Sequence, residues 1–232
     1  MKLWKLVPLY VIVVAGSLAL VFWSSNAVTV MTENSPIVGR SCVVIDAGHG
    51  GIDGGATSCS GILESQLNLE IALRLKDLMG FLGYDTKMIR TTDTSIYTEG
   101  NTIAAQKASD LKQRVKIVND TPSSLLVSIH QNTFSDSQYS GAQVFYANDD
   151  QSKALAQKLQ TMLITNLNPE SNRKIKSSQG IYLMQHITRP GVLVECGFLT
   201  NPQEEAKLRS AEYQKKLASV IGICIAEYLQ QS

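Results

Sequence analysis

Short apolar runs alternate with amphipathic segments along the chain, and this pattern predicts its strands and helices. Five short segments, three of them almost entirely aliphatic, are predicted to form strands. They cover residues 43–45, 84–89, 125–129, 142–146 and 191–194. After Glu64, apolar residues recur at spacings of four and three, which is typical of one face of a helix. These residues are Leu67, Ile71, Leu75, Leu78 and Leu82.

Further helices are expected over residues 111–119, 152–167 and 211–229. Strands that alternate with helices predict an α/β fold with three layers, in which helices cover both faces of a mostly parallel twisted sheet. Asp149 and Asp150 precede one of these helices, so we interpret them as an amino-terminal cap and not as an acidic metal pair. Two polar segments, residues 92–110 and 168–179, are expected to be loops near a functional site.

The amino terminus has the pattern of an export signal. Lys2 and Lys5 precede an apolar stretch over residues 6–23. As a helix this stretch reaches about 27 Å, just short of the ~30 Å hydrocarbon core of a membrane. Because Ser25 and Ala27 form a small-x-small cleavage pattern, a cleaved signal peptide and an uncleaved membrane anchor both stay open. We therefore predict a membrane-targeting segment over residues 1–27, a polar linker over 28–40, and one exported domain over 41–232.

Composition narrows the classes of partner. The formal net charge is +1, and no basic stripe with interleaved aromatic residues occurs, so nucleic-acid binding is not expected. The four cysteines are Cys42, Cys59, Cys196 and Cys224. Their spacing does not define a disulfide, and most of them are interpreted as small buried hydrophobic residues.

Candidate metal-binding and catalytic residues lie where predicted strands end. His49 follows the first aliphatic run in a glycine-rich turn, His130 follows the run at 125–129, and Glu195 follows the run at 191–194. If the sheet is parallel, these ends share one edge with Glu64, which opens the first helix. Two imidazoles and a carboxylate form a hydrolytic zinc set, and a second carboxylate serves such a site as general base. A lone histidine in a turn is more often structural, but this grouping favours a metal site.

A phosphate-binding loop is a competing interpretation of the same turn. The segment at residues 48–53 begins like a dinucleotide fingerprint, since a glycine-rich loop after a strand can bind phosphate. However, Asp53 stands where the third glycine is needed and would repel a pyrophosphate. The chain also lacks a Gly-Lys-Ser or Gly-Lys-Thr motif for a nucleoside triphosphate.

Taken together, the motifs resemble those of the type 3 family of zinc-dependent N-acetylmuramoyl-L-alanine amidases, and most of all the germination-specific amidases of endospore-forming bacteria. The resemblance spans about residues 41–229. The motifs that carry it are residues 43–51, Glu64 with Asn68 and Leu69, residues 90–93, Leu111 with Arg114, residues 127–132, and residues 193–201.

The resemblance implies a zinc ion (Zn²⁺) bound by His49, Glu64 and His130, with Glu195 as the catalytic carboxylate. The substrate would be peptidoglycan, cut between the lactyl group of muramic acid and the first L-alanine of the stem peptide. Together with the export pattern of residues 1–27, this predicts a place at the outer face of the cytoplasmic membrane or in the cell-wall space, which in a spore former is the space around the forespore. A partner protein is expected to control metal binding or activity, for example through the loop at 92–110. Gln131 and Thr133 follow His130 at positions where the family usually has small residues, which leaves the wall of the pocket there undefined.

Two other functions remain open at this point. One is a zinc peptidase that acts on another amide, and the other is a catalytically silent, membrane-tethered wall-binding protein. Cys196 is not expected to be a ligand, because neighbouring residues on a strand point to opposite faces and Glu195 is the better candidate. His186, the remaining histidine, is interpreted as structural.

Overall fold

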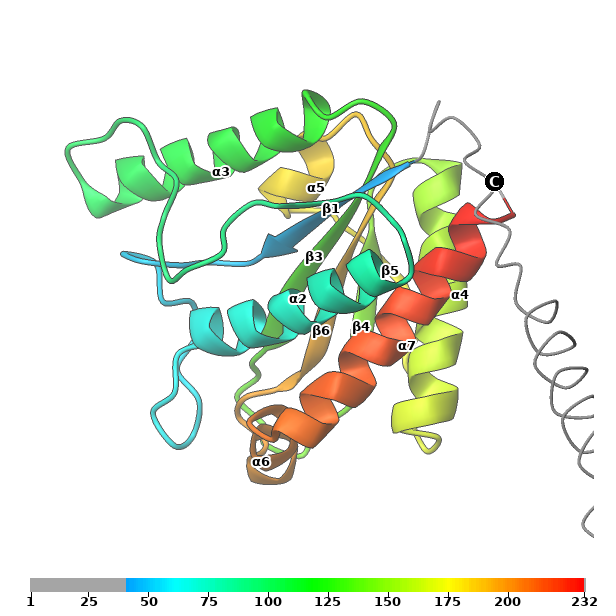
Figure 1. Ribbon diagram of the computed structural model, residues 1–232. Helices are drawn as coiled ribbons and strands as arrows, with labels where there is room; N and C mark the ends of the chain where they lie inside the picture. The colour runs from blue at the N-terminus through cyan, green and yellow to red at the C-terminus, as the bar shows by residue number, and fades with distance from the viewer. Residues whose placement is uncertain (1–40, 232) are drawn as a thin grey trace, which may run out of the picture. The chain divides into compact units, whose positions relative to one another are not determined.

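The computed structural model describes residues 41–231, which form a six-stranded sheet with helices on both faces. The strand order is β2-β1-β3-β6-β4-β5, and Figure 1 shows β1, β3, β6 and β4 side by side in this order. The strands are β1 (Cys42–Ala47), β2 (Thr86–Met88), β3 (Ser124–Asn132), β4 (Gln143–Tyr146), β5 (Lys176–Ser177) and β6 (Gly191–Phe198). The strands β2, β1, β3 and β6 run parallel, and β4 is antiparallel to β6. The prediction of a mostly parallel sheet is confirmed.

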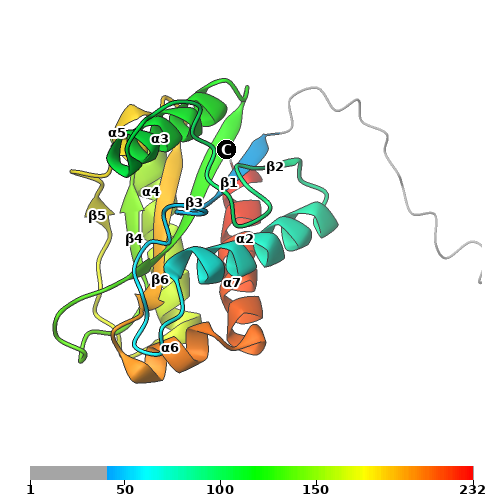
Figure 2. The same cartoon turned by 90° about the vertical axis from the view of Figure 1, so that its left-hand side faces the viewer.

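Two helical layers enclose this sheet, as predicted. One layer contains α2 (Glu64–Phe81), α4 (Asp150–Leu167) and α7 (Ala211–Leu229), and the other contains α3 (Ile103–Asn119) and α5 (Tyr182–His186). Figures 1 and 2 show the two layers on opposite faces of the sheet. A further short helix, α6 (Pro202–Leu208), lies between β6 and α7 in the chain.

The aliphatic runs form strands because both faces of the sheet are covered. In β1, Val43 and Ile45 belong to the core beneath α2, α4 and α7, whereas Val44 packs with Leu126 and Val118 beneath α3. Consecutive strand residues point to opposite faces, so a strand buried on both faces needs apolar residues in succession. This explains the lack of alternation in the sequence.

Most element predictions are confirmed, and the start of one helix needs correction. The helix at 211–229 was placed correctly, and the Asp149 side chain accepts a hydrogen bond from the Ser152 amide, as expected of a cap. The α3 helix, however, begins at Ile103 and not at residue 111, so the expected loop at 92–110 ends at Thr102, which caps the helix. The first turns of α3 are largely exposed, and therefore lack the apolar repeat that would have marked them in the sequence.

The strands β3 and β6 also extend further than predicted. His130 and Glu195 lie inside them and pair with each other across the sheet. The elements β5, α5 and α6 were not predicted. The targeting segment at 1–27 and the linker at 28–40 lie outside the described residues. No helix within residues 41–231 is long and apolar enough to cross a membrane.

The four cysteines are free thiols in the described part of the chain. Cys196 and Cys224 are buried, in agreement with their interpretation as small hydrophobic residues, whereas Cys42 is half-buried and Cys59 is exposed. Cys224 lies on the buried side of α7.

Candidate metal and catalytic site

The turn after β1 carries His49 in an unusual backbone conformation. His49 has a φ of 62°, in the left-handed region that residues other than glycine rarely adopt. Gly50 has a φ of 129°, and its backbone pairs with that of Asp53 to close the turn. Gly48 lies against the ring of His130, so that a Cβ atom at this position would be 2.2 Å from His130 Nε2. Glycine at this position therefore allows the His130 ring to lie against the turn that carries His49.

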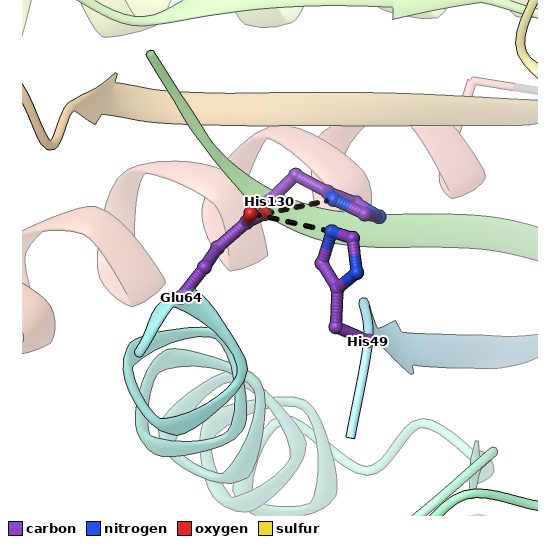
Figure 3. A group of neighbouring side chains, drawn as sticks. All are labelled: His49, Glu64 and His130. Carbon is purple, nitrogen blue, oxygen red and sulfur yellow. Dashed lines mark hydrogen bonds and ion pairs between the residues drawn. The ribbon is translucent and has the colours of Figure 1, made fainter. Parts of the chain in front are cut away.

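His49, Glu64 and His130 form one cluster, which Figure 3 shows. The Nε2 atom of His49 lies 3.2 Å from Oε2 of Glu64, and Nδ1 of His130 lies 3.0 Å from Oε1 of Glu64. The two imidazole rings are nearly perpendicular, with centroids 4.9 Å apart. One ligand atom from each residue lies within 4.8 Å of the others. Within residues 41–231, this is the set of His, Cys, Asp and Glu side chains placed to share a metal ion.

The Glu64 carboxylate is held by backbone and side-chain donors. It accepts hydrogen bonds from the Ala56 amide (3.0 Å), the Gln131 amide (3.1 Å) and Asn68 Nδ2 (3.2 Å). Burial alone would raise its pKa, but its contacts with the two histidines outweigh burial and hold the pKa of Glu64 well below its usual range. The carboxylate is therefore ionised and directed at the space between the two imidazoles.

The same contacts act on His49 in the opposite sense. Burial lowers the pKa of His49, but the carboxylates of Glu64 and Asp53 raise it to about 9. A metal ion binds the neutral imidazole, so it must displace a proton from this residue at neutral pH. The donor set of two imidazoles and one ionised carboxylate fits zinc, which binds such sets in hydrolytic sites with one position left open.

Glu195 lies beside this cluster and is not part of it. Glu195 is half-buried, and its buried Oε2 atom has no hydrogen-bond partner within the described protein. Burial raises the pKa of Glu195 to about 7. Cys196 points the other way, into the core beneath α2, α4 and α7, so the expectation that only one of these two neighbours faces the site is confirmed. An unpartnered carboxylate of this pKa can accept and release a proton near neutral pH.

The site opens into a cleft of about 390 Å³ between the sheet and the layer formed by α3 and α5. His49, His130 and Glu195 line one end of it. The apolar part of the lining consists of Ile52, Leu111, Ile181, Tyr182, Leu183 and Leu193. A small ligand therefore has room beside the cluster and against an apolar wall.

Two buried arginines fix the backbone of the turn. Arg114 Nη1 pairs with Asp46 Oδ1 at 2.5 Å, and its Nη2 donates to the His49 carbonyl at 2.7 Å. Arg90 donates to the carbonyls of Ala47 (2.8 Å) and Gly48 (3.0 Å). Burial would raise the pKa of Asp46, but the charge of Arg114 lowers it, so the pair is ionised. The sequence motifs included both arginines without indicating this role.

Sequence reasoning missed several residues around the cluster. Asp53, considered only as an obstacle to phosphate, accepts a hydrogen bond from His49 Nδ1 at 2.8 Å. Gln131 does not form the pocket wall; it is buried on the other face and donates to Asn68 Oδ1 at 3.1 Å. The signal for Asp53 was only a general one, since a metal-ligating histidine usually donates its second ring N–H to a carboxylate or carbonyl, and this tendency does not indicate a position in the sequence. His186 bonds to the Tyr182 carbonyl and stacks on its ring, as a structural histidine would.

Comparisons with known proteins identify the family of this chain. The profile of the Amidase_3 family, described as N-acetylmuramoyl-L-alanine amidase, matches residues 43–227. The germination-specific N-acetylmuramoyl-L-alanine amidase of Bacillus subtilis is 40% identical over 198 residues, which cover 84% of this chain and 82% of that protein.

Two solved structures are similar along their length. One is the CwlD amidase of Clostridioides difficile, solved in complex with the GerS lipoprotein, with a TM-score of 0.80 and 38% sequence identity. The match covers 83% of this chain and 100% of the amidase chain. The other is an N-acetylmuramoyl-L-alanine amidase of Clostridium difficile, with a TM-score of 0.73 and 31% sequence identity. This match covers 84% of this chain and 100% of the amidase chain. The chain thus belongs to the Amidase_3 family of N-acetylmuramoyl-L-alanine amidases.

Proposed function

We propose that this amidase is zinc-dependent and hydrolyses the amide bond between the muramic acid lactyl group and L-alanine in the peptidoglycan of the spore cortex. The observation that carries the proposal is the convergence of His49, Glu64 and His130 beside Glu195, whose buried Oε2 atom has no hydrogen-bond partner among the described residues. Similarity to a germination-specific amidase of Bacillus subtilis supports the choice of cortex peptidoglycan.

His49, Glu64 and His130 would hold the zinc ion, with Glu64 supplying the negative charge. When bound, zinc supplies a Lewis acid that polarises a carbonyl and lowers the pKa of water. Glu195 accepts the proton of the attacking water at its carboxylate and delivers it to the leaving nitrogen of L-alanine. Its buried position suits this exchange, because a pKa near 7 allows the carboxyl group both to take up and to release a proton.

The location and partners of the enzyme form the second part of the proposal. Residues 1–27 would direct the domain across the cytoplasmic membrane, either as a cleaved signal or as an anchor, so that the domain faces the space around the forespore. A protein partner would control metal binding or activity. The complex of the related CwlD amidase with the GerS lipoprotein supports the idea of a partner.

Digestion of purified cortex peptidoglycan tests the function. The metal-loaded domain should release stem peptides with a free L-alanine amine, detected by mass spectrometry, and a chelator should abolish their release. Cleavage at another amide would favour a zinc peptidase instead. Binding to peptidoglycan without cleavage, at full zinc occupancy, would favour a catalytically silent wall-binding protein.

A further inference from the structure

His49 is held at both nitrogens of its ring. Its Nε2 faces Glu64, and its Nδ1 lies 2.8 Å from Oδ2 of Asp53. The backbone of His49 is in the left-handed region, and the residue lies in a turn outside the sheet. The ring of this ligand therefore depends on side-chain contacts for its orientation.

Asp53 is itself anchored to a distant helix. Its other oxygen, Oδ1, accepts from Lys107 Nζ of α3 at 2.7 Å and from the Gly55 amide at 3.3 Å. Its side chain is 26% exposed, so solvent only partly screens these contacts. His49, Asp53 and Lys107 form a chain of polar contacts that joins the turn after β1 to the first turns of α3.

His130 differs from His49 in this respect. It lies within β3, where strand pairing fixes its backbone, and Gly48 packs against its ring. Its orientation therefore follows from the sheet. Both imidazoles contact Glu64, but among the described residues only His49 has a second carboxylate at its other ring nitrogen.

We infer that Asp53 is a positioning residue for His49 and that Lys107 fixes Asp53 in place. A carboxylate that accepts from Nδ1–H selects the tautomer with a free Nε2, which is the nitrogen directed at Glu64. The inference rests on the proposed zinc site. Loss of such an outer contact typically lowers metal affinity by about 10–100-fold.

Zinc affinity, measured by competition with a chromophoric chelator, tests this role without substrate. Asp53→Ala should weaken binding by about 10–100-fold. Asp53→Asn should lose less, since an amide oxygen can still accept from Nδ1–H but carries no charge. Lys107→Met should show a smaller loss than Asp53→Ala. Asp77→Asn, which removes an exposed carboxylate paired with Lys76 elsewhere on the surface, is the matched control and should bind as the wild type does.

Long-range ¹H–¹⁵N spectra of the side chains provide a readout that loss of packing alone would not change. The chain has three histidines, so their signals can be assigned by substitution. In the zinc-loaded wild type, His49 should carry its proton on Nδ1, and Asp53→Ala should weaken or shift this signal while that of His186 stays in place. Wild-type affinity in Asp53→Ala, or metal bound through Nδ1 of His49, would overturn the assignment. Unchanged affinity in Lys107→Met would refute the part played by α3. If the variants show the expected losses of zinc affinity but the wild-type protein does not cleave peptidoglycan, the role of Asp53 stands and only the proposed function is refuted.

Discussion

Replacement of Glu195 by glutamine tests whether this residue transfers protons or binds the metal. Glutamine keeps the shape of the side chain and removes its ability to accept a proton. Because Glu195 lies beside the cluster of His49, Glu64 and His130, Glu195→Gln should retain zinc and lose about 100-fold or more in turnover. Glu64→Gln should instead lose zinc affinity first, and excess zinc should restore part of its rate.

The same substitution should stabilise the metal-free protein. Burial raises the pKa of Glu195 from 4.5 to about 7 in the fold. Below pH 4.5 the carboxyl group is protonated in both the folded and the unfolded chain. As the pH rises towards 7, the unfolded chain loses this proton first, so the fold loses stability. At about 1.4 kcal/mol per pH unit, ionised Glu195 costs roughly 3 kcal/mol above pH 7.

Urea unfolding in the presence of a chelator measures this effect. The stability difference between Glu195→Gln and the wild type should grow between pH 4.5 and 8, up to about 3 kcal/mol. Taking the difference cancels groups that titrate equally in both proteins. A difference that does not change with pH would show that Glu195 is not desolvated, and the argument for a proton carrier with a pKa near 7 would fail. Loss of zinc in Glu195→Gln, or rescue by zinc equal to that of Glu64→Gln, would make Glu195 a ligand.

Three further predictions follow from the site. His49→Ala and His130→Ala should each lose zinc and activity while circular dichroism shows an intact fold, since the sheet supplies most of the buried apolar area. Zinc binding at pH 7–8 should release about one proton from His49, whose pKa is about 9 in the metal-free protein, and calorimetry in buffers of different ionisation enthalpy would count it. Arg114→Met should destabilise the fold by about 3–5 kcal/mol in urea titrations, because it leaves Asp46 charged and buried, whereas Lys116→Met on the same helix removes an exposed pair with Asp120 and should cost under about 1 kcal/mol.

The strands and the candidate ligands could be predicted because the same physical constraint governs both. A strand covered on both faces must be apolar throughout, so polar residues that follow such a run mark the edge of the core. His49, His130 and Glu195 each follow an aliphatic run, and the parallel sheet brings them together. The roles of the four site residues remain predictions, although the structure places the three expected ligands within one cluster.

The contacts that orient these residues could not be predicted from the pattern. Asp53 and Lys107 are polar residues on partly exposed segments, and nothing in the apolar repeat links positions so far apart in the chain. The early start of α3 could not be predicted for a related reason, because its first turns bury little apolar surface. Gln131 and Asn68 bond to each other inside the core, where hydropathy would place apolar residues. Such pairs depend on three-dimensional packing and have no periodic signature.

The charges of the site also explain why its fold need not depend on metal. Glu64 lies beside His49, whose pKa is raised to about 9, so the metal-free cluster can balance a buried carboxylate with a proton on His49. Metal binding then exchanges protons for a cation in a cluster that is already assembled. Two unfavourable features of the site are the left-handed backbone of His49 and the unpartnered Oε2 atom of Glu195. The first costs about 1–2 kcal/mol and the second about 3 kcal/mol when ionised. Both lie where a substrate amide would meet the ligands, so these unfavourable contributions to stability fall at the proposed reaction site. The surrounding sheet supplies the apolar core that stabilises the fold.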